Sequence, residues 1–379
     1  MEQNLRPARP VAPGRILRQE LEARGWTQRD LAAILGRPEQ MVSEIINGAK
    51  QITPETSVEL SEAIGSSPEF WYNLEANYRL ELARRQGRDD AIVRRSRLYS
   101  ALPLQEMARR GWLTLRESVD ALEAETARFF GVDVFTTTPE ATIAAARLRC
   151  STVRQPAAYA QLAWLQRARR LAQEQTVPTW RAEHIEPLVA ELMSLAARAE
   201  ETARVPGVLA RWGVRCVFLR HLSKTYLDGA AFYLEGKPCI ALTLRYDRVD
   251  AFWFTLLHEI AHLGEDDQAC YLDVLEEQPQ RDVDHGNQEE LEMAEPDAHE
   301  VWANQRAGGW LIAPDAFQAF VAATRPFFSK ARIEAFAAEQ RRHPGVVLGR
   351  LQREGLVPYK NLRGLLVKVS PYLKDNIRD

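Results

Sequence analysis

Apolar residues recur at helical spacing through most of the chain, and the clearest case lies near the N-terminus. In QRDLAAIL they fall on one face of a helix, and Thr27, with Asp30 three residues later, predicts its N-cap. Gly36 permits a tight turn, and Pro38 opens a second periodic stretch, PEQMVSEII, which an Asn-Gly pair ends. Two short helices joined through a glycine turn predict a helix-turn-helix, whose second helix enters the major groove of DNA.

This segment, from GRILRQELEARGWTQ to SSPEFW, resembles the lambda-repressor-like, XRE-type family and in particular HigA-like antitoxins. The resemblance implies a five-helix domain, often dimeric, that binds double-stranded operator DNA. Glutamine can pair with adenine, glutamate can accept a hydrogen bond from cytosine, and arginine and lysine suit phosphates. The side chains expected to face DNA are Gln28, Arg37, Glu39, Gln40, Ser43, Glu44 and Lys50.

The charge of the chain limits this interpretation. Lysine and arginine total 49 against 52 aspartates and glutamates, a net charge of -3. No global field therefore draws the protein onto nucleic acid or an anionic membrane, and DNA binding must come from a local surface. Because phosphate contacts supply most non-specific affinity, the alternative is that these helices form only a protein-interaction or dimerisation module.

Residues 86–205 read as helices separated by polar or proline-containing joints. The basic run RARR at 167–170 suits a solvated helix face better than a binding site. The four cysteines lie far apart without a CxxC pair, which argues against a thiolate metal site and suits a reducing compartment. We interpret this region as a helical connector without chemistry of its own.

The pattern becomes β-prone between residues 214 and 245. The runs VRCVFLRHL, GAAFYLE and PCIALTLR are separated by the turn signals Asp228-Gly229 and Gly236-Lys237-Pro238, which predicts a small sheet. Directly afterwards DRVDAFWFTLLHEIAHLG, rich in aromatic and aliphatic residues, predicts a largely buried helix. The charged HE pair inside it would be costly to bury without a partner such as a metal ion.

That helix carries His258, Glu259 and His262 in an HExxH pattern. Residues four apart share a helix face, so both imidazoles can point at one ion while Glu259 projects beside them. Two imidazoles and a third protein ligand make a catalytic Zn²⁺ site with one open position. Glu259 is then the expected general base for the water that attacks a peptide carbonyl. The alternative is a structural cluster in which these side chains satisfy one another.

From about residue 205 to 370 the chain resembles the ImmA/IrrE family of zinc metallopeptidases, through DGAAFYLEGKPCIALTLRYDRVDAFWFTLLHEIAHL, EVWANQRAGGWLIAPDAF and HPGVVLGRLQREGLVPYKNL. The resemblance implies a gluzincin-like zinc centre and, in some relatives, proteolysis of DNA-binding repressors. It implies Glu300 as the third ligand and Asn304, four residues later, as the residue that orients a ligating histidine. Ala303 and Ala307 are small enough to let this helix approach the HEIAH helix.

The chain departs from that family pattern in two places. Trp302 stands where many relatives carry a second acid, and residues 265–297 form a long, acid-rich insertion. If Glu300 only complements the dipole of its own helix, another ligand is needed. The competing side chains are Glu289, Glu290, Glu292, Glu295, His285 and His299.

Two further expectations concern the substrate. His221, Tyr226 and Tyr233 are candidate hydrogen-bond donors to an oxyanion. By analogy with other sheets that bind peptides, an extended substrate is expected to add to the edge of the small sheet near residues 240–244.

Together these patterns predict a mainly α protein with a small β-sheet (α+β). Its expected parts are an XRE-type helix-turn-helix domain at 1–85, a helical connector at 86–205 and a zinc peptidase-like domain at 206–379. Neither a signal-peptide core nor an apolar run of membrane-spanning length is evident. We therefore expect a cytoplasmic protein that makes no contact with a membrane.

The leading functional hypothesis is a homodimeric regulator that binds operator DNA and carries Zn²⁺ for the cleavage of a repressor or antitoxin-like protein, or of its own chain. The alternative is a HigA-like antitoxin or repressor whose peptidase-like domain is not catalytic and serves in sensing or toxin binding. A scaffold that binds neither DNA nor metal is the third hypothesis.

Overall fold

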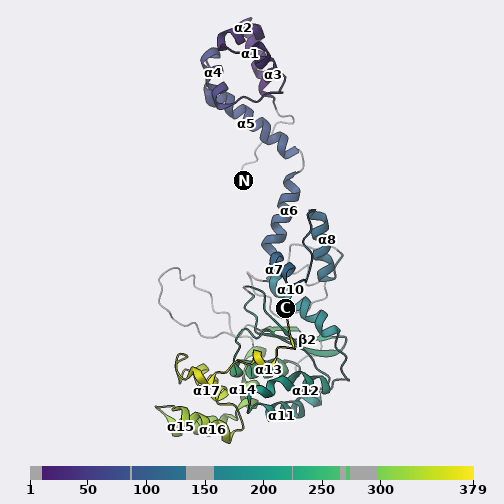
Figure 1. The fold of residues 1–379 in the computed structure, drawn as a ribbon, viewed down its shortest axis with the longest axis vertical. Helices are drawn as coiled ribbons and strands as arrows, with labels where there is room; N and C mark the ends of the chain where they lie inside the picture. Colours follow the sequence, from purple (N-terminus) through teal and green to yellow (C-terminus); the bar gives the residue numbers. More distant parts are fainter. Residues whose placement is uncertain (1–10, 86–87, 134–157, 224, 265–269, 274–297) are drawn as a thin grey trace. The chain divides into compact units, whose positions relative to one another are not determined.

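The computed structural model describes residues 11–85, 88–133, 158–223, 225–264, 270–273 and 298–379 (Figure 1). The chain divides into two compact units, residues 1–96 and 97–379, and each has a hydrophobic core of its own. None of the helices in the described ranges is long and apolar enough to cross a membrane.

The first unit is helical. Its core takes Leu17, Leu31, Leu60 and Trp71 from four different helices, and all four side chains are fully buried. Trp71 donates from its indole nitrogen to Ser66 Oγ at 2.6 Å, so the polar end of the largest core side chain is satisfied. The helices are α1 (Pro13–Arg24), α2 (Gln28–Leu35), α3 (Glu39–Ile46), α4 (Pro54–Ile64) and α5 (Pro68–Arg85), and α6 (Arg88–Ala101) follows.

The turn expected between the two motif helices is present. Thr27 Oγ1 accepts a hydrogen bond from the backbone N–H of Asp30 at 3.2 Å, and the Asp30 carboxylate accepts one from Thr27 N–H at 2.7 Å. This capping box fixes the start of α2. Gly36 ends α2 with a φ of 64°, and Pro38 is the N-cap of α3. The helix-turn-helix order read from the sequence is therefore confirmed.

The second unit is built on a mixed sheet whose described strands lie in the order β4-β2-β3-β1-β5. Strand β2 is antiparallel to β3 and β4, whereas β1 is parallel to β3 and β5. Glu235 and Gly236 both have positive φ and form the two-residue turn of the β2–β3 hairpin. The strands are β1 (Arg215–Leu219), β2 (Gly229–Leu234), β3 (Lys237–Leu242), β4 (Cys270–Asp273) and β5 (Ile377–Arg378).

The position of β3 corrects one expectation. Because β3 lies between β2 and β1, its backbone groups are already paired on both sides. The hypothesis that a substrate adds to an edge near residues 240–244 was therefore wrong. A mainly helical protein with a small mixed sheet is confirmed.

Hydrophobic cores cover both faces of the sheet, because successive strand side chains point to opposite sides. Phe218 and Ile240 point into one core, and Val217 and Ala241 point into the other. The core around Val217 is covered by α7 (Leu104–Arg109), α8 (Val119–Phe130), α10 (Ala158–Gln173) and the end of α6. These helices lie within the segment interpreted as a connector.

The core around Phe218 contains the HEIAH helix, α13 (Val249–His262). Its other helices are α11 (Ile185–Leu195), α12 (Val205–Arg211), α14 (Ala298–Leu311), α15 (Pro314–Thr324), α16 (Lys330–Glu339) and α17 (Pro344–Arg353). Four 3₁₀ turns in the described residues complete the unit: η1 (Ala182–His184), η2 (Ala199–Arg204), η3 (Arg363–Leu365) and η4 (Ser370–Tyr372).

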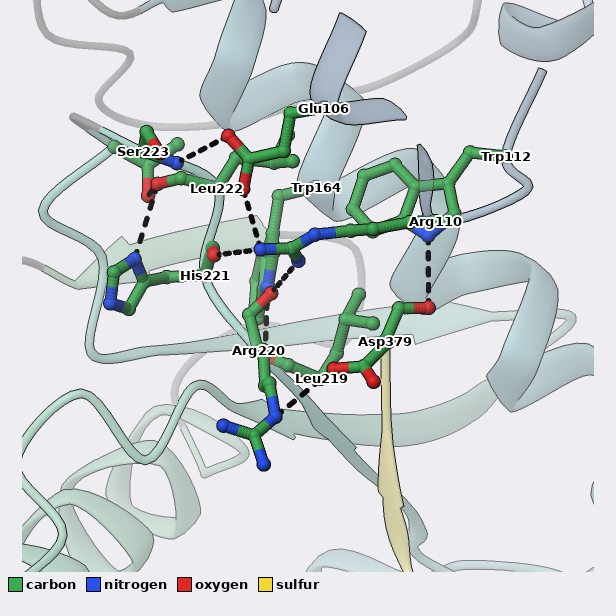
Figure 2. Close-up of polar contacts among 11 residues, drawn as sticks. Glu106, Arg110, Trp112, Trp164, Leu219, Arg220, His221, Leu222, Ser223 and Asp379 are labelled. Carbon is green, nitrogen blue, oxygen red and sulfur yellow. Dashed lines mark hydrogen bonds and ion pairs between the residues drawn. The ribbon is translucent and has the colours of Figure 1, made fainter. Parts of the chain in front are cut away.

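Side chains of α7 and of its C-cap residue, Arg110, hold the start of the loop that leads from β1 to β2 (Figure 2). Arg110 donates to the carbonyl oxygens of Arg220 and His221, each at 2.8 Å. Glu106 accepts from Arg110 at 2.6 Å and from the backbone N–H of Ser223 at 3.1 Å. These side chains thus satisfy backbone groups of the loop, in addition to the backbone hydrogen bond that Arg220 N–H donates to Arg378 of β5.

The same region holds the last residue of the sequence (Figure 2). The indole nitrogen of Trp112 donates to the carbonyl oxygen of Asp379 at 2.9 Å, and Arg220 Nε lies 3.0 Å from an Asp379 carboxylate oxygen. On the face of the sheet that α10 covers, Trp164 of α10 donates to the carbonyl oxygen of Leu219 at 3.0 Å. Strand β5 is therefore fixed beside β1 by contacts at its end as well as by pairing.

Replacing Glu106 with glutamine tests the contact between α7 and this loop. Burial alone would raise the pKa of Glu106, but the hydrogen bonds from Ser223 and the charge of Arg110 outweigh it and hold the pKa below its ordinary value. The ionised carboxylate therefore stabilises the fold above the unfolded-state pKa of about 4.3, and the contribution is lost as pH falls through the lower folded-state pKa. We expect Glu106→Gln to lower the free energy of unfolding by about 1 kcal/mol at neutral pH.

Urea denaturation at a series of pH values measures this effect. The difference between Glu106→Gln and the wild type should shrink as the pH falls below the unfolded-state pKa of about 4.3 and passes through the lower folded-state pKa, where the wild-type carboxyl group becomes protonated. Glu183→Gln is the matched control, since the Glu183 side chain is 73% exposed. A Glu106→Gln effect of the same size at acid and neutral pH would contradict this account.

Candidate metal centre and helix-turn-helix surface

Three side chains converge beside α13. His258 and His262 lie one turn apart on this helix, both are buried, and their Nε2 atoms are 3.0 Å apart. Glu300 of α14 places Oε2 at 3.3 Å from His258 Nε2 and Oε1 at 3.7 Å from His262 Nε2. The residues predicted from the sequence as metal ligands thus lie within reach of one point.

These separations suit a zinc ion. Ligand atoms of a tetrahedral site lie about 2.0–2.2 Å from the metal, which puts them about 3.3–3.5 Å from one another. The three observed separations, 3.0, 3.3 and 3.7 Å, bracket that value. Two imidazoles and a carboxylate are also the donor set that catalytic zinc accepts, with a fourth position left for water or substrate.

Helix α14 supplies Glu300 because small side chains let it approach α13. Ala303 and Ala307 are fully buried at the contact between the two helices. Asn304 follows Glu300 by one helical turn, and its Oδ1 atom is buried with no hydrogen-bond partner among the described residues. A buried acceptor at this place fits a group that receives an N–H from a ligating imidazole.

Glu259 lies next to the converging atoms but is not one of them. Its side chain is fully buried, and it packs against Gly229, the first residue of β2. A Cβ atom at Gly229 would lie 2.1 Å from Glu259 Oε1 and 3.1 Å from Thr255 Cγ2. The glycine that the sequence marked only as a turn therefore also makes room for the Glu259 carboxylate.

Trp302 does not occupy the metal site. Arg306 lies over the Trp302 ring at 5.1 Å and over the Trp310 ring at 4.9 Å. Positions 302, 306 and 310 share a helix face, and that face is not the one that presents Glu300. Trp302 thus belongs to a cation–π ladder on that face.

The other sequence candidates that the structure describes have contacts of their own or are exposed. His221 contacts the carbonyl oxygen of Leu222 at 3.2 Å, and Tyr233 donates to the carbonyl oxygen of Leu263 at 3.0 Å, where α13 ends. Tyr226 is 56% exposed, and His299 is not part of the converging set. The remaining competitors, Glu289, Glu290, Glu292, Glu295 and His285, lie outside the described residues.

In the first unit, α3 and its surroundings present the side chains expected to contact DNA. Arg37 pairs with Glu59, whose hydrogen bond and charge raise the pKa of Arg37. Gln40 donates to Glu44 Oε1 at 2.9 Å. All of the side chains expected to contact DNA are at least partly exposed: Gln28, Arg37, Glu39, Gln40, Ser43, Glu44 and Lys50. Helix α3 itself carries two glutamates and no basic residue, so positive charge has to come from its flanks.

Gly229→Ala tests the packing of Glu259. The added methyl group has to displace a buried carboxylate, so we expect the free energy of unfolding to fall by about 1–3 kcal/mol, the usual cost of overpacking. Thermal denaturation of the full chain measures the change. Gly308→Ala is the control, because nothing lies within 4 Å of the new methyl group on α14. That variant should be neutral or slightly stabilising, and equal effects of the two would refute the assignment.

Comparison with known proteins finds relatives of the first unit. The helix-turn-helix family matches residues 17–71. Antitoxin HigA-1 of Vibrio cholerae is 40% identical over 68 residues, which are 18% of this chain and 64% of the relative. Virulence-associated protein A′ of Dichelobacter nodosus is 34% identical over 85 residues, 22% of this chain and 74% of the relative.

Among solved structures, an addiction module antidote protein of the HigA family from Coxiella burnetii is similar. It is 36% identical, with 22% of this chain and 90% of that chain covered, and the TM-score is 0.21. This chain spans less than two thirds of the length of the Vibrio antitoxin. Through its first unit, the protein belongs to the helix-turn-helix family.

Proposed function

We propose that this protein is a DNA-binding regulator whose second unit is a zinc-dependent endopeptidase. The observation that carries the second part is the convergence of His258, His262 and Glu300 at separations suited to zinc, beside the buried Glu259. A hydrogen-bonded cluster of two imidazoles and a carboxylate would use the same atoms. The metal content of the purified protein distinguishes a zinc site from such a hydrogen-bonded cluster.

Each residue of the proposed centre would have a distinct role. Zn²⁺ held by His258, His262 and Glu300 would act as a Lewis acid toward a peptide carbonyl group. Glu259 would take the proton of the attacking water at a carboxylate oxygen and deliver it to the leaving amine. Gly229 would leave the space that this carboxylate occupies, since a Cβ atom at that position would displace it. The substrate proposed is a repressor or antitoxin-like protein, or this chain itself.

The first unit is proposed to bind operator DNA as a homodimer. The family match and the exposure of Gln40 and Glu44 on α3 support this role, because both side chain types read base edges. Lys50 lies just beyond α3, where a phosphate contact would position the helix. Two half-sites bound together would offset the weak basic character of one copy.

A second candidate function is an antitoxin or repressor whose second unit binds a toxin or a signal without cleaving it. The match to an antitoxin from Vibrio cholerae favours it. Exposed apolar side chains on the second unit, among them Phe327 at 81% and Tyr372 at 42%, give such a partner apolar groups to contact.

The zinc content of protein purified without added metal tests the centre. We expect about one zinc per chain in the wild type, loss of zinc in His258→Ala and Glu300→Ala, and retention in Glu259→Gln. Asn304→Ala should weaken zinc binding by about 10- to 100-fold, because it removes the acceptor that orients a ligating imidazole. Elemental analysis measures all five proteins.

Glu339→Ala is the control for Glu300→Ala, since it removes an exposed glutamate from α16. A wild-type protein that takes up no zinc after reconstitution at neutral pH would exclude the peptidase and favour the second candidate. Zinc binding without Glu259-dependent cleavage of any protein substrate would favour a non-catalytic metal domain.

The salt dependence of DNA binding tests the first unit. Duplexes selected from a random library provide the ligand, and fluorescence anisotropy gives the affinity at several salt concentrations. Lys50→Ala should reduce the slope of log affinity against log salt by about 1, because one phosphate contact is lost. Gln40→Ala should cost about 1–3 kcal/mol for the selected sequence and leave the slope unchanged.

Lys330→Ala, which removes an exposed charge in the second unit, is the control for Lys50→Ala. Binding that does not depend on salt, or that is unaffected by both Lys50→Ala and Gln40→Ala, would leave the first unit as an interaction module.

A further inference from the structure

A groove on the second unit lies between the turn that joins α15 to α16 and the segment that follows α17. Residues 326–329 form one side of it, and residues 356–358 and 360–362 form the other. Its volume is about 570 Å³, within the range of about 300–1,000 Å³ that is usual for ligand sites in proteins. None of these residues belongs to the proposed metal centre or to the helix-turn-helix.

The lining of the groove is largely apolar. Phe328, Leu356 and Leu362 are partly buried and pack against the core around Phe218, so they form a floor that continues the interior of the unit. Phe327 differs from them, because its side chain is 81% exposed, the largest value among the large apolar side chains of the described residues. A ring that stays in water in this way gains free energy when a partner covers it.

The two segments that form the groove carry positive charge. Residues 325–330 and 355–363 contain two arginines and two lysines but neither aspartate nor glutamate. Lys330 is paired with Glu334. The other three cations are exposed and have neither an ion pair nor a side-chain hydrogen bond within the described residues: Arg325, Lys360 and Arg363. In a chain whose net charge is -3, the groove is therefore a local site of positive charge.

Both sides of the groove are held in place from within the protein. Gln352 of α17 is 2% exposed, and its Nε2 atom donates to the carbonyl oxygens of Asn361 at 3.2 Å and Pro358 at 3.5 Å. On the other side, Ser329 caps α16 by accepting a hydrogen bond from the Arg332 N–H at 3.3 Å. A partner would thus bind a preformed surface and would not have to order these segments.

We propose that this groove binds an acidic segment of a partner polypeptide that carries a large apolar side chain. The apolar side chain would lie between Phe327 and the floor, and carboxylates on either side of it would pair with the cations. Because Arg325 lies on one side of the groove and Lys360 on the other, an extended chain that crosses the groove can reach both. The inference needs neither zinc nor cleavage, and it supplies recognition of a partner protein under either candidate function.

Single-stranded nucleic acid is the main competing occupant. Cationic grooves with exposed aromatic side chains bind its phosphates and stack its bases. The lining favours a polypeptide instead, because most of its apolar residues are aliphatic side chains and prolines, which pack against apolar side chains but offer no aromatic ring for a base. A second copy of this chain is the other competitor, since the first unit is proposed to form a homodimer.

Fluorescence anisotropy of peptide pools on the full-length protein provides the test. The probes are three fluorescein-labelled random decapeptide pools with a fixed central triplet, which is Glu-Phe-Glu, Gln-Phe-Gln or Glu-Ser-Glu. We expect the Glu-Phe-Glu pool to bind about tenfold more tightly than either of the others, because each of those lacks one of the two contributions.

Variants of the groove assign the two preferences to residues. Phe327→Ala should abolish the preference for phenylalanine over serine. Lys360→Gln should reduce both the preference for glutamate over glutamine and the salt dependence of binding, because a charge pair is lost. Tyr372→Ala and Lys374→Gln are the matched controls, since both residues are exposed outside the groove, and they should retain both preferences.

Three results would overturn the inference. The first is equal binding of the three pools by the wild type, or preferences that survive both groove variants. The second is an oligothymidine probe that binds the wild type more tightly than the peptides and is lost in both variants, which would assign the groove to nucleic acid. The third is a fall in the mass measured by sedimentation on Phe327→Ala, which would assign it to a second copy.

Zinc content separates this inference from the proposed function. Both preferences in a protein that takes up no zinc would support the groove and remove the peptidase. Equal binding of the pools by a protein with about one zinc per chain would remove the groove and leave the peptidase. Circular dichroism of each variant checks that these exposed substitutions leave the fold intact.

Discussion

The second unit depends on how α13 accommodates two imidazoles and a carboxylate inside an apolar helix. His258, Glu259 and His262 are essentially inaccessible to solvent, and polar groups in such a place require partners. Helix α14 brings Glu300 to the imidazoles, while β2 begins with a glycine beneath the carboxylate. Ala303 and Ala307, the small side chains on α14 that permit its approach, follow from the same requirement.

Features encoded in neighbouring residues could be read from the sequence. The capping box at Thr27, the glycine turn after α2 and the hairpin signal at Gly236 all specify local backbone geometry, and each appears in the structure. Glu300 could be proposed because the resemblance implies a glutamate followed four residues later by an asparagine, as at Asn304, and its carboxylate does lie beside His258.

Features that depend on distant contacts could not be read in this way. Strand order is set by which strands find one another, so nothing in the β3 sequence indicated that both of its sides are paired. The space that Gly229 leaves for the Glu259 carboxylate can be recognised only in the structure, because in the sequence Asp228-Gly229 predicted nothing more than a turn. The stacking of Arg353, the last residue of α17, on Phe254 could not be predicted either, because Phe254 lies about a hundred positions earlier and only the packing of α17 on α13 joins them.

In the first unit, side chains expected to contact DNA already have partners within the protein. Gln40 and Glu44 are hydrogen-bonded to each other, and Arg37 is held by Glu59. In the proposed DNA complex, contact with base edges and phosphates would have to replace these internal partners, so each such contact would contribute only the difference between two hydrogen bonds. A surface of this kind favours discrimination between sequences over tight non-specific attachment.

The hydrogen bond between Trp112 and Asp379 joins residues 267 positions apart. During synthesis the first unit has all of its 96 residues long before the chain reaches β5, and domains fold as they emerge from the ribosome. The sheet beside β1 has to wait for residues 377–379. A nascent chain can therefore present a folded N-terminal unit before the sheet of the second unit can close.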